Sequence, residues 1–474
     1  MPQQERTIDV LRWPVVGPLL RGRHARTSIQ TVLLLVSIVL VAEGLFGPPL
    51  APANLTTVVT WVHYRGLLVV ALLAAGNFFC TGCPFVLVRD MGRRLHQPGR
   101  RWPRWLRTKW IAIALFAGVL FAYELFDLWA LPGGTAWLLL AYFGAALAVD
   151  LVFSGATFCK YLCPIGQFNF VASTVSPLEL RVIAPDRCRT CGTYDCIKGN
   201  RTTGQRGCEL GLFLPAKVGN IDCTFCLDCV QACPHGNIAL ATRVPGAELL
   251  ETGRRSGIGR LAGRSDIAAL VVVFVFGGLL NAFAMVEPGV AVERWLGGMM
   301  GVSSEAPALA VLFAIALILV PVLLLGTAAV GTRLLVRSTA GSTADTAVRY
   351  AYALVPVGFG VWLAHYGYHL LTGALTIVPA TQSAVVLVVG WPAFGEPLWE
   401  WTGLRPGSVL PLQYGAVLLG TLGSLGLAWL VSERDHPSRV VRAAIPWCAT
   451  VVALGLAAVW ILSQPMDMRA MLVH

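Results

Sequence analysis

The sequence predicts a mainly α-helical, polytopic membrane protein that carries a polar, cysteine-rich insert. Of its 474 residues, 56% are hydrophobic and only 13% are charged, which is too apolar for an ordinary soluble protein. Apolar runs of about 20 residues, the length needed to cross a hydrocarbon core, recur along the chain. One long stretch between them is dense in glycine, proline and charge, and it is too polar to cross a bilayer.

Nine runs are predicted to be membrane spans. They cover approximately residues 30–48, 58–79, 109–131, 135–154, 266–286, 306–330, 348–372, 410–431 and 443–463. The apolar segment 378–394 is shorter and is interrupted by two prolines, so we expect a surface helix or a re-entrant piece there. The chain therefore divides into a cytoplasmic leader, a four-span domain, the insert and a C-terminal membrane domain of about five spans, at residues 1–29, 30–154, 155–265 and 266–474.

The placement of arginine orients these spans. The net charge is +11, but Arg and Lys concentrate in short loops beside the spans and form no separate basic domain, so we expect no nucleic-acid partner. The most basic loop runs from Arg89 to Lys109, and the leader carries five more arginines at positions 6, 12, 21, 23 and 26. By the positive-inside rule, both lie in the cytoplasm. We expect a multi-pass protein of the bacterial inner membrane, with the N-terminus and the insert inside and the C-terminus outside.

The clearest chemical motif is a run of four cysteines in the insert. Cys223, Cys226, Cys229 and Cys233, followed by Pro234, have the C-x2-C-x2-C-x3-C-P spacing that binds a [4Fe–4S] cluster. The short spacings let three sulfurs converge on one cubane, and the fourth sulfur typically serves a neighbouring cluster. Zinc is the competing interpretation, but zinc motifs usually separate two cysteine pairs by a longer loop.

A second cysteine set precedes this run and supplies the ligands that a second cluster needs. In a two-cluster arrangement, the fourth cysteine of each motif serves the other cluster. The expected ligand sets are Cys188, Cys191, Cys196 and Cys233 for one [4Fe–4S] cluster, and Cys223, Cys226, Cys229 and Cys208 for the other. Because the spacing of the first set is irregular, a three-cysteine cluster or a zinc ion remains an alternative there.

This layout resembles the NapH/NosR-type membrane polyferredoxins, in which paired spans end in C-x3-C-P motifs and a two-cluster, ferredoxin-like insert follows. The resemblance covers roughly residues 30–265, and its most specific pieces are the segments 158–166 (FCKYLCPIG) and 223–234. It implies a protein that passes electrons between the quinone pool or the cytoplasm and periplasmic respiratory systems, such as nitrate or nitrous oxide reduction. The first membrane motif has two residues between its cysteines instead of three, and residues 266–474 have no recognised counterpart.

Two further cysteine pairs lie where spans end, at Cys80 and Cys83 and at Cys159 and Cys163, each pair followed by proline. Their helices end on the same side of the membrane, so the four thiols are expected to meet at the cytoplasmic surface. They are candidates for another metal or cluster, or for a dithiol–disulfide couple. The alternative is that Cys-Pro merely caps these helices with small apolar side chains.

Ionisable residues within the spans indicate a site near the outer face. His365 and His369 share one helix face, and four other groups fall at comparable depth: His63, Glu43, Glu124 and Asp127. Such groups could bind a metal, ligate heme or serve a quinone. The alternative is that polar side chains close to the interface cost little and have no further role.

These patterns predict an integral membrane iron–sulfur protein that relays single electrons, a redox component more than a stand-alone enzyme. The expected partners are the quinone pool or a cytoplasmic electron donor, and a periplasmic or membrane redox protein. No nucleophile elbow, P-loop or zinc-hydrolase motif occurs in the sequence. Two alternatives remain open: a copper-reducing assembly factor for a periplasmic metalloenzyme, and a transporter or scaffold stabilised by structural zinc.

Overall fold

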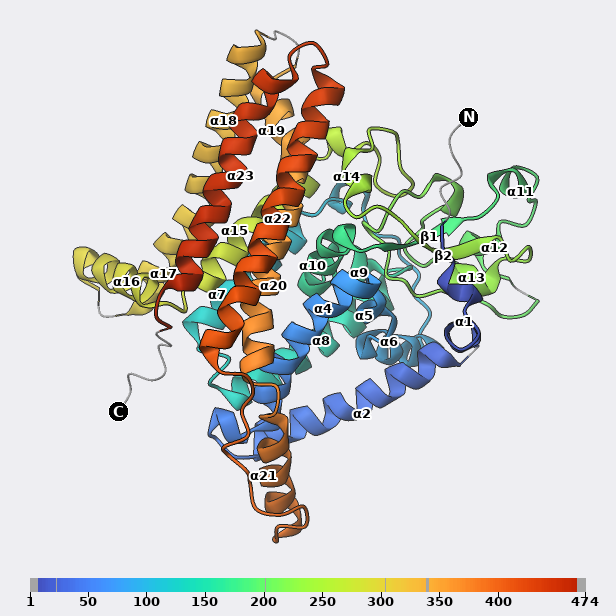
Figure 1. Ribbon diagram of the computed structural model, residues 1–474. Helices are drawn as coiled ribbons and strands as arrows, with labels where there is room; N and C mark the ends of the chain where they lie inside the picture. Colours follow the sequence, from blue (N-terminus) through green and yellow to red (C-terminus); the bar gives the residue numbers. More distant parts are fainter. Residues whose placement is uncertain (1–6, 23, 201, 303, 338–340, 467–474) are drawn as a thin grey trace. The chain divides into compact units, whose positions relative to one another are not determined.

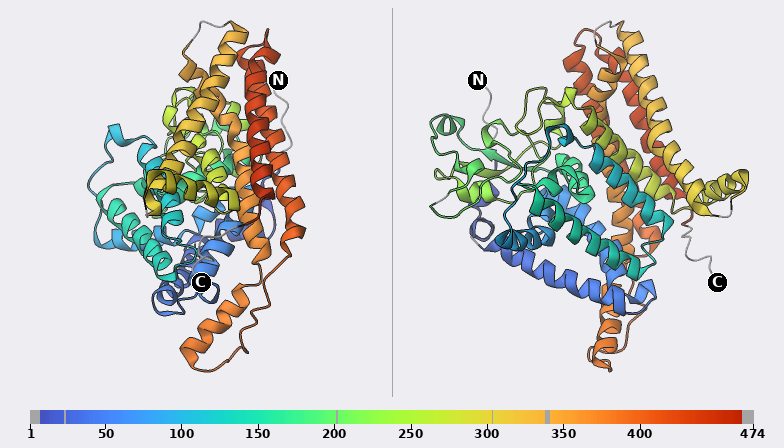
Figure 2. Two further views of the ribbon diagram at one scale, coloured as in Figure 1. Left: turned by 90° about the vertical axis from the view of Figure 1, so that its left-hand side faces the viewer. Right: turned by 180° about the vertical axis from the view of Figure 1, so that it is seen from behind.

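The computed structural model describes residues 7–466 apart from residues 23, 201, 303 and 338–340 (Figures 1 and 2). Arg6 and Arg23 of the leader therefore lie outside the described residues. Helices make up most of the described chain, and its sheet structure is one pair of short strands. The predicted mainly α fold class is confirmed.

Eight helical segments of the described chain are long and apolar enough to cross a membrane. Five are single helices: α2 (Ala25–Phe46), α8 (Pro132–Val152), α15 (Ser265–Phe283), α22 (Pro406–Asp435) and α23 (Val440–Ser463). Three are built from consecutive pieces: α3 (Leu55–Thr57), η3 (Val58–Tyr64) and α4 (Arg65–Ala75); α17 (Glu305–Ala314), η8 (Ile315–Leu319) and α18 (Val320–Val336); α19 (Thr343–Ala351), η9 (Tyr352–Leu354) and α20 (Val355–Thr372). The protein thus has the helices of a multi-pass membrane protein.

The count of long spans is eight where the sequence predicted nine, because the expected third span is shorter. It forms α7 (Trp110–Leu125), whose 16 residues extend about 24 Å, less than the hydrocarbon thickness of about 30 Å. The helix ends where Asp127 takes a left-handed conformation with φ of 42°. The segment predicted to be too short to span forms α21 (Ile377–Val389) and ends at Gly390.

The chain folds as two compact units. Unit 1 comprises Met1–Ser37, Ala71–Ala112 and Tyr142–Asp266, and unit 2 comprises Ile38–Val70, Ile113–Ala141 and Ile267–His474. Unit 1 contains twelve of the thirteen cysteines, and unit 2 contains Cys448 and the six ionisable residues expected near the outer face.

Two antiparallel strands organise the insert part of unit 1. β1 (Leu178–Val182) pairs with β2 (Ile238–Thr242), with Leu180 opposite Leu240. Both leucines are buried, and they pack in a core that also contains Phe225, Cys223 and Cys229. The eight insert cysteines lie between these strands in the sequence. The strand pairing therefore holds the two ends of the cysteine-rich segment side by side.

Short helices connect the rest of unit 1. They are α1 (Val16–Arg21), α5 (Phe78–Thr81), α6 (Pro84–Leu95), α9 (Thr157–Tyr161), α10 (Pro164–Ala172), α11 (Pro185–Arg189), α12 (Asp195–Lys198), α13 (Asp228–Ala232) and α14 (Ala247–Leu250). The single-turn pieces are η1 (Val10–Arg12), η4 (Arg104–Leu106), η5 (Ser173–Val175), η6 (Leu214–Ala216) and η7 (Leu261–Gly263). Glycine, proline and charge are frequent between them, which explains why long helices do not form there.

Unit 2 is a bundle in which α20, α22 and α23 pack along one another (Figures 1 and 2). Glycine permits the close approach of α20 and α22, because a Cβ atom on Gly420 would lie 2.5 Å from the carbonyl oxygen of Pro356. Such small-residue contacts are typical of helix packing in membranes. Tyr350 stacks on Trp447 with 4.7 Å between ring centroids, which joins α19 to α23. Unit 2 also contains η2 (Ala51–Ala53) and α16 (Glu287–Met300).

Candidate metal centres

Four cysteines line one pocket of unit 1, and we call them thiol group A: Cys188, Cys191, Cys196 and Cys233. The strand register explains why they meet. Val182 pairs with Ile238 at the end of the sheet, so the chain leaves β1 toward Cys188 beside the point where it returns from Cys233. Asn237 joins the two ends, since its Nδ2 donates to Cys188 Sγ at 3.4 Å and its backbone N–H donates to Cys233 Sγ at 3.5 Å.

The thiols of group A differ in their surroundings. Backbone N–H groups of Tyr194 and Thr193, together with the Thr193 hydroxyl, lower the pKa of Cys191 to about 7. Burial and the neighbouring thiols together raise the pKa of Cys196 to about 11. All four side chains are partly exposed. Group A is therefore a set of converging sulfurs that solvent reaches.

The remaining insert cysteines form thiol group B: Cys208, Cys223, Cys226 and Cys229. Cys223 and Cys229 are buried. Their loop contains three non-glycine residues with left-handed backbone, Asp222, Phe225 and Leu227, with φ of 61°, 51° and 62°. This conformation costs a non-glycine residue about 1–3 kcal/mol of folding free energy. Where left-handed and right-handed residues alternate, successive backbone N–H groups point to one concave side of the loop, as in many Fe–S sites. The loop has the backbone shape that anionic sulfur requires.

Cys208 comes to group B from the preceding loop. Burial raises the pKa of Cys229, and the thiols of Cys226, Cys223 and Cys208 raise it further, so the four sulfurs lie within electrostatic range of one another. The backbone N–H of Cys208 donates to the carbonyl of Cys196 at 3.0 Å. Groups A and B are therefore neighbours, and each contains one expected ligand set.

Nowhere in the described ranges do three or more His, Cys, Asp or Glu side chains lie close enough together to hold a single metal ion. A tetrahedral zinc at about 2.3 Å from each sulfur draws its thiolates to within about 4 Å of one another. A cubane bonds each cysteine to a different iron, so its sulfurs stand farther apart. The donor type, the shared pocket and the turned N–H groups suit iron–sulfur clusters, and the assignment of clusters to these cysteines stays a prediction.

The cysteines at the span ends form thiol group C: Cys80, Cys83, Cys159 and Cys163. The two motifs have the same local shape, a short helix followed by a Cys-Pro step that begins α6 or α10. Burial raises the pKa of the Cys80 thiol to about 12 and also raises the pKa of Cys163, with Cys83 and Cys80 adding to the second shift. Cys83 likewise adds to the raised pKa of Cys159. The four thiols thus lie within electrostatic range of one another in unit 1, with Cys163 buried and the other three partly buried.

Group C adjoins the loop of group B. Asn77 Nδ2 donates to the carbonyl of Cys223 at 2.9 Å, and Thr81 Oγ1 donates to the carbonyl of Phe225 at 2.7 Å. Lys109 Nζ forms a buried ion pair of 2.6 Å with Asp222 Oδ1, directly before Cys223. Side chains around Cys80 therefore support the backbone of the Cys223–Cys229 loop. Groups A, B and C follow one another within unit 1.

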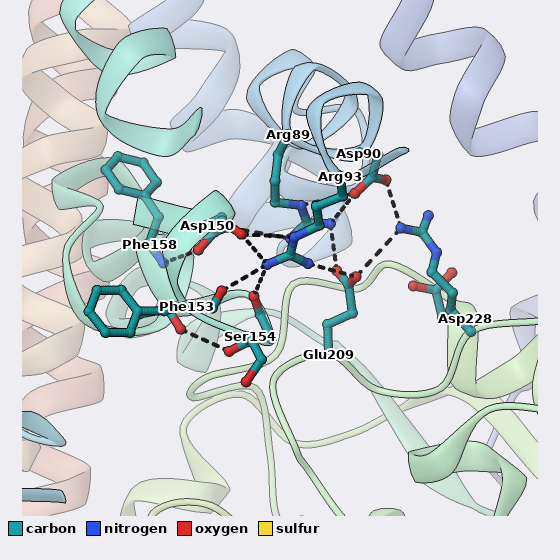
Figure 3. A network of polar contacts seen from close by, with 12 residues as sticks. Arg89, Asp90, Arg93, Asp150, Phe153, Ser154, Phe158, Glu209 and Asp228 are labelled. Atoms are coloured by element: carbon teal, nitrogen blue, oxygen red, sulfur yellow. Dashed lines mark hydrogen bonds and ion pairs between the residues drawn. The ribbon is translucent and has the colours of Figure 1, made fainter. Parts of the chain in front are cut away.

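A buried charge network also joins the segments next to Cys83, Cys159 and Cys208 (Figure 3). Arg89 of α6 points toward Glu209, which follows Cys208, and its Nη2 lies 2.6 Å from Glu209 Oε2. Asp150 lies on its other side and accepts the backbone N–H of Phe158, directly before Cys159, at 2.8 Å. Although burial alone would raise the pKa of Glu209, the guanidinium groups of Arg89 and Arg206 hold it below its ordinary value. The network fixes the spacing of the motifs.

Three of the six ionisable residues expected near the outer face have structural contacts in unit 2. Both ring nitrogens of His63 contact backbone carbonyls, those of Val58 and Ala374, at 3.1 and 3.2 Å. Glu43 Oε2 accepts the backbone N–H of Thr56 at 3.1 Å. Asp127 occupies the left-handed turn after α7. These contacts explain the three side chains by local structure.

The other three, His365, His369 and Glu124, lie near a buried arginine that the sequence analysis overlooked. The two imidazole rings are 4.9 Å apart, and Nε2 of each is buried without a hydrogen-bond partner. The positive charge of Arg65 lies within electrostatic range of both histidines. Tyr123 and Tyr366 lie beside Arg65, and both are also within electrostatic range of Glu124. An arginine inside the apolar run 58–79 was the signal that could have identified this cluster.

The Arg65 guanidinium is held by aromatic groups. Its Cζ atom lies 5.0, 5.0 and 4.6 Å from the ring centroids of Trp61, Tyr123 and Tyr366. Its Nη2 donates to the Tyr123 hydroxyl at 3.2 Å. Arg65 takes part in none of the ion pairs between described residues, so its charge is balanced chiefly by ring faces and oxygen acceptors.

Comparison with known proteins gives one short match. Over 88 residues, the chain is 31% identical to "Putative electron transport protein YccM" of Escherichia coli (strain K12), and the matched part is 19% of this chain. It is 22% of YccM, so this chain matches about a fifth of that relative's length. No protein-family model and no solved structure matches the chain. A match of this length does not establish a family, and the resemblance to NapH/NosR-type proteins stays a prediction.

Proposed function

We propose that this protein is a membrane electron-transfer protein in which thiol groups A and B each hold a [4Fe–4S] cluster. The observation that carries the proposal is the arrangement of eight cysteines in two adjoining groups, each with the membership that two-cluster ferredoxin spacing requires. The name of the relative YccM, an electron transport protein, agrees with this role. Bound clusters would supply one-electron redox chemistry.

The residues around the thiols have distinct tasks in this proposal. The left-handed residues of the group B loop turn N–H groups toward the sulfurs and stabilise their negative charge. Phe225 and Leu227 are buried, as are two cysteines of group B, Cys223 and Cys229, whereas all four cysteines of group A are partly exposed. Since burial and hydrogen bonds to sulfur set the potential of such sites, the two groups should differ in potential. The more exposed group A is the better place for exchange with a soluble donor.

The membrane side of the relay is proposed to be a quinone. The cluster of Arg65, Tyr123, Tyr366, His365 and His369 offers hydrogen-bonding groups inside an apolar helical unit, and the carbonyl oxygens of a quinone head group are suitable acceptors. A metal ion at this place is less well supported, because a cluster of three ligating side chains was not found among the described residues. Respiratory partners on the outer side, and a cytoplasmic position of the insert in a bacterial inner membrane, belong to the same proposal.

Anaerobic purification followed by iron, sulfide and EPR analysis tests the function. Cys226→Ser should remove one cluster signal and about four iron atoms per chain, because it deletes one ligand of group B. Cys448→Ser is the matched control, since Cys448 belongs to α23 of unit 2, whereas the three thiol groups belong to unit 1. Its iron content should equal that of the unchanged protein.

The alternatives give different results in the same preparation. Colourless protein with stoichiometric zinc would indicate the scaffold or transporter interpretation and would refute electron transfer through groups A and B. Reduction of copper by the reconstituted protein, without electron exchange with a quinone, would favour the assembly-factor interpretation. Full retention of the iron signal in Cys226→Ser would overturn the ligand assignment.

A further inference from the structure

We infer that thiol group C holds a third iron–sulfur cluster, bound by Cys80, Cys83, Cys159 and Cys163. The inference rests on the proposed electron-transfer function, because it adds a carrier to that relay. It does not follow from the spacing of the motifs, since C-x2-C-P and C-x3-C-P steps also serve as plain helix caps. It follows from the groups that the fold directs at these four sulfurs.

Hydrogen-bond donors surround the sulfurs of group C. The backbone N–H of Gly166 donates to Cys163 Sγ at 3.2 Å, and Asn169 Nδ2 donates to Cys80 Sγ at 3.4 Å. The N–H groups of Phe85 and Val86 oppose the rise that burial causes in the pKa of Cys83. Neutral thiols are weak acceptors, whereas metal-bound thiolates carry negative charge and accept such bonds well. The donors are those that an anionic sulfur site needs.

Two helices add positive potential at the same place. α6 and α10, of 12 and 9 residues, begin at Pro84 and Pro164, directly after Cys83 and Cys163. The N-terminus of a helix carries about half a positive charge and favours anions. Both helices begin beside the sulfurs of group C, so their positive potential favours negatively charged thiolates over neutral thiols there.

A buried arginine is the independent observation. Arg89 is 1% exposed, lies within electrostatic range of Cys83 and Cys159, and its Nη1 atom has no hydrogen-bond partner. Asp150 Oδ2 is 3.6 Å from that atom, too far for a hydrogen bond. Arg89 is also ion-paired with Asp90 and Glu209, and its positive charge adds to the potential that favours anionic sulfur at group C.

An iron–sulfur cluster suits this site better than a disulfide or a single ion. Disulfides would be neutral and would leave the hydrogen-bond donors of group C without an anionic acceptor. A single ion needs three or more ligands around one point, an arrangement not found in the described part of the chain.

The position of group C gives the cluster its role. Cys80 lies within electrostatic range of Cys223, and Asn77 and Thr81 bond directly to the group B loop. A cluster at group C would take up one electron and give up one electron, with no bond broken and no proton required. Group C would thus be the carrier next to group B in unit 1.

The test counts iron and EPR signals in the anaerobic full-length protein. Unchanged protein should contain about 2–4 iron atoms beyond the eight or so of groups A and B. Cys163→Ser should lose that extra iron and one EPR signal while the signals of groups A and B persist, and Cys448→Ser should lose nothing. A total of about eight iron atoms that Cys163→Ser leaves unchanged would overturn the inference, as would disulfides at these four cysteines. Iron-free protein would instead refute the proposed function itself.

A second variant guards against misfolding of the buried cysteine mutant. Asn169→Leu keeps all four sulfurs and removes the N–H donor to Cys80. It should shift the reduction potential of one cluster signal downward and leave the other two unchanged, because the lost hydrogen bond stabilised negative charge. Three unchanged potentials, or a shift shared equally by all signals, would contradict the assignment.

Discussion

The ion pair between Lys109 and Asp222 should hold the start of the group B loop, and replacing Lys109 with Met tests this. The two charged atoms are 2.6 Å apart, and the side chains are only 2% and 3% exposed. Removal of one partner leaves a buried uncompensated carboxylate, which costs about 3–5 kcal/mol. The ammonium also donates to the carbonyl of Lys160 at 2.6 Å, and the loss of that bond adds about 1 kcal/mol.

Thermal unfolding of the detergent-solubilised protein measures this effect. Since 1 kcal/mol shifts the midpoint of a unit of this size by about 2–4 °C, the total loss of about 4–6 kcal/mol in Lys109→Met should lower the transition of unit 1 by about 8–24 °C. The double variant Lys109→Met/Asp222→Asn should recover much of the loss, because it removes both charges and asparagine accepts the left-handed backbone at position 222. A Lys109→Met transition within about 2 °C of the unchanged protein would refute the reasoning.

Three further predictions concern charge, packing and binding. The pKa of Glu209 is lowered in the folded protein, so this carboxylate stabilises the fold at a pH above its pKa in the unfolded chain, and the stabilisation is lost on acidification. The unfolding midpoint of unit 1 should therefore fall below about pH 4, and Glu209→Gln should make the midpoint less dependent on pH. Gly420→Val should destabilise unit 2 because Pro356 leaves no room for a Cβ atom, whereas Gly415→Ala, which meets open space, should not; equal midpoints would contradict the packing. Arg65→Met should weaken quinone binding at least tenfold in a titration while iron content stays constant, and unchanged binding would exclude the proposed site.

Periodicity and composition predicted the fold class because burial in lipid requires long apolar helices, and the sequence states their length directly. The helix at the expected third span is shorter than predicted for a local reason. Hydropathy continues beyond Leu125, but the left-handed backbone at Asp127 ends α7 early. The hydropathy averaged over a window of residues does not depend on the φ angle of one residue, so it cannot reveal such a helix end.

The thiol groups could be anticipated only in part. Spacing together with the two-cluster pattern predicted the two sets of cysteines, and their role as cluster ligands stays a prediction. Arg89 and Asn169 could not be recognised as neighbours of group C, since their contacts depend on α6, α8 and α10 meeting in unit 1. The pairing of β1 with β2, which brings Cys188 near Cys233, is likewise a long-range contact that local pattern does not reveal.

The central claim is that the cysteines of unit 1 hold iron and inorganic sulfide. The most direct measurement is the iron and acid-labile sulfide content of protein purified without oxygen, with low-temperature EPR on the reduced sample. The account predicts brown protein with at least about eight iron atoms and equal sulfide per chain, and EPR signals from at least two clusters. Protein without iron or sulfide, or with zinc in their place, would contradict it.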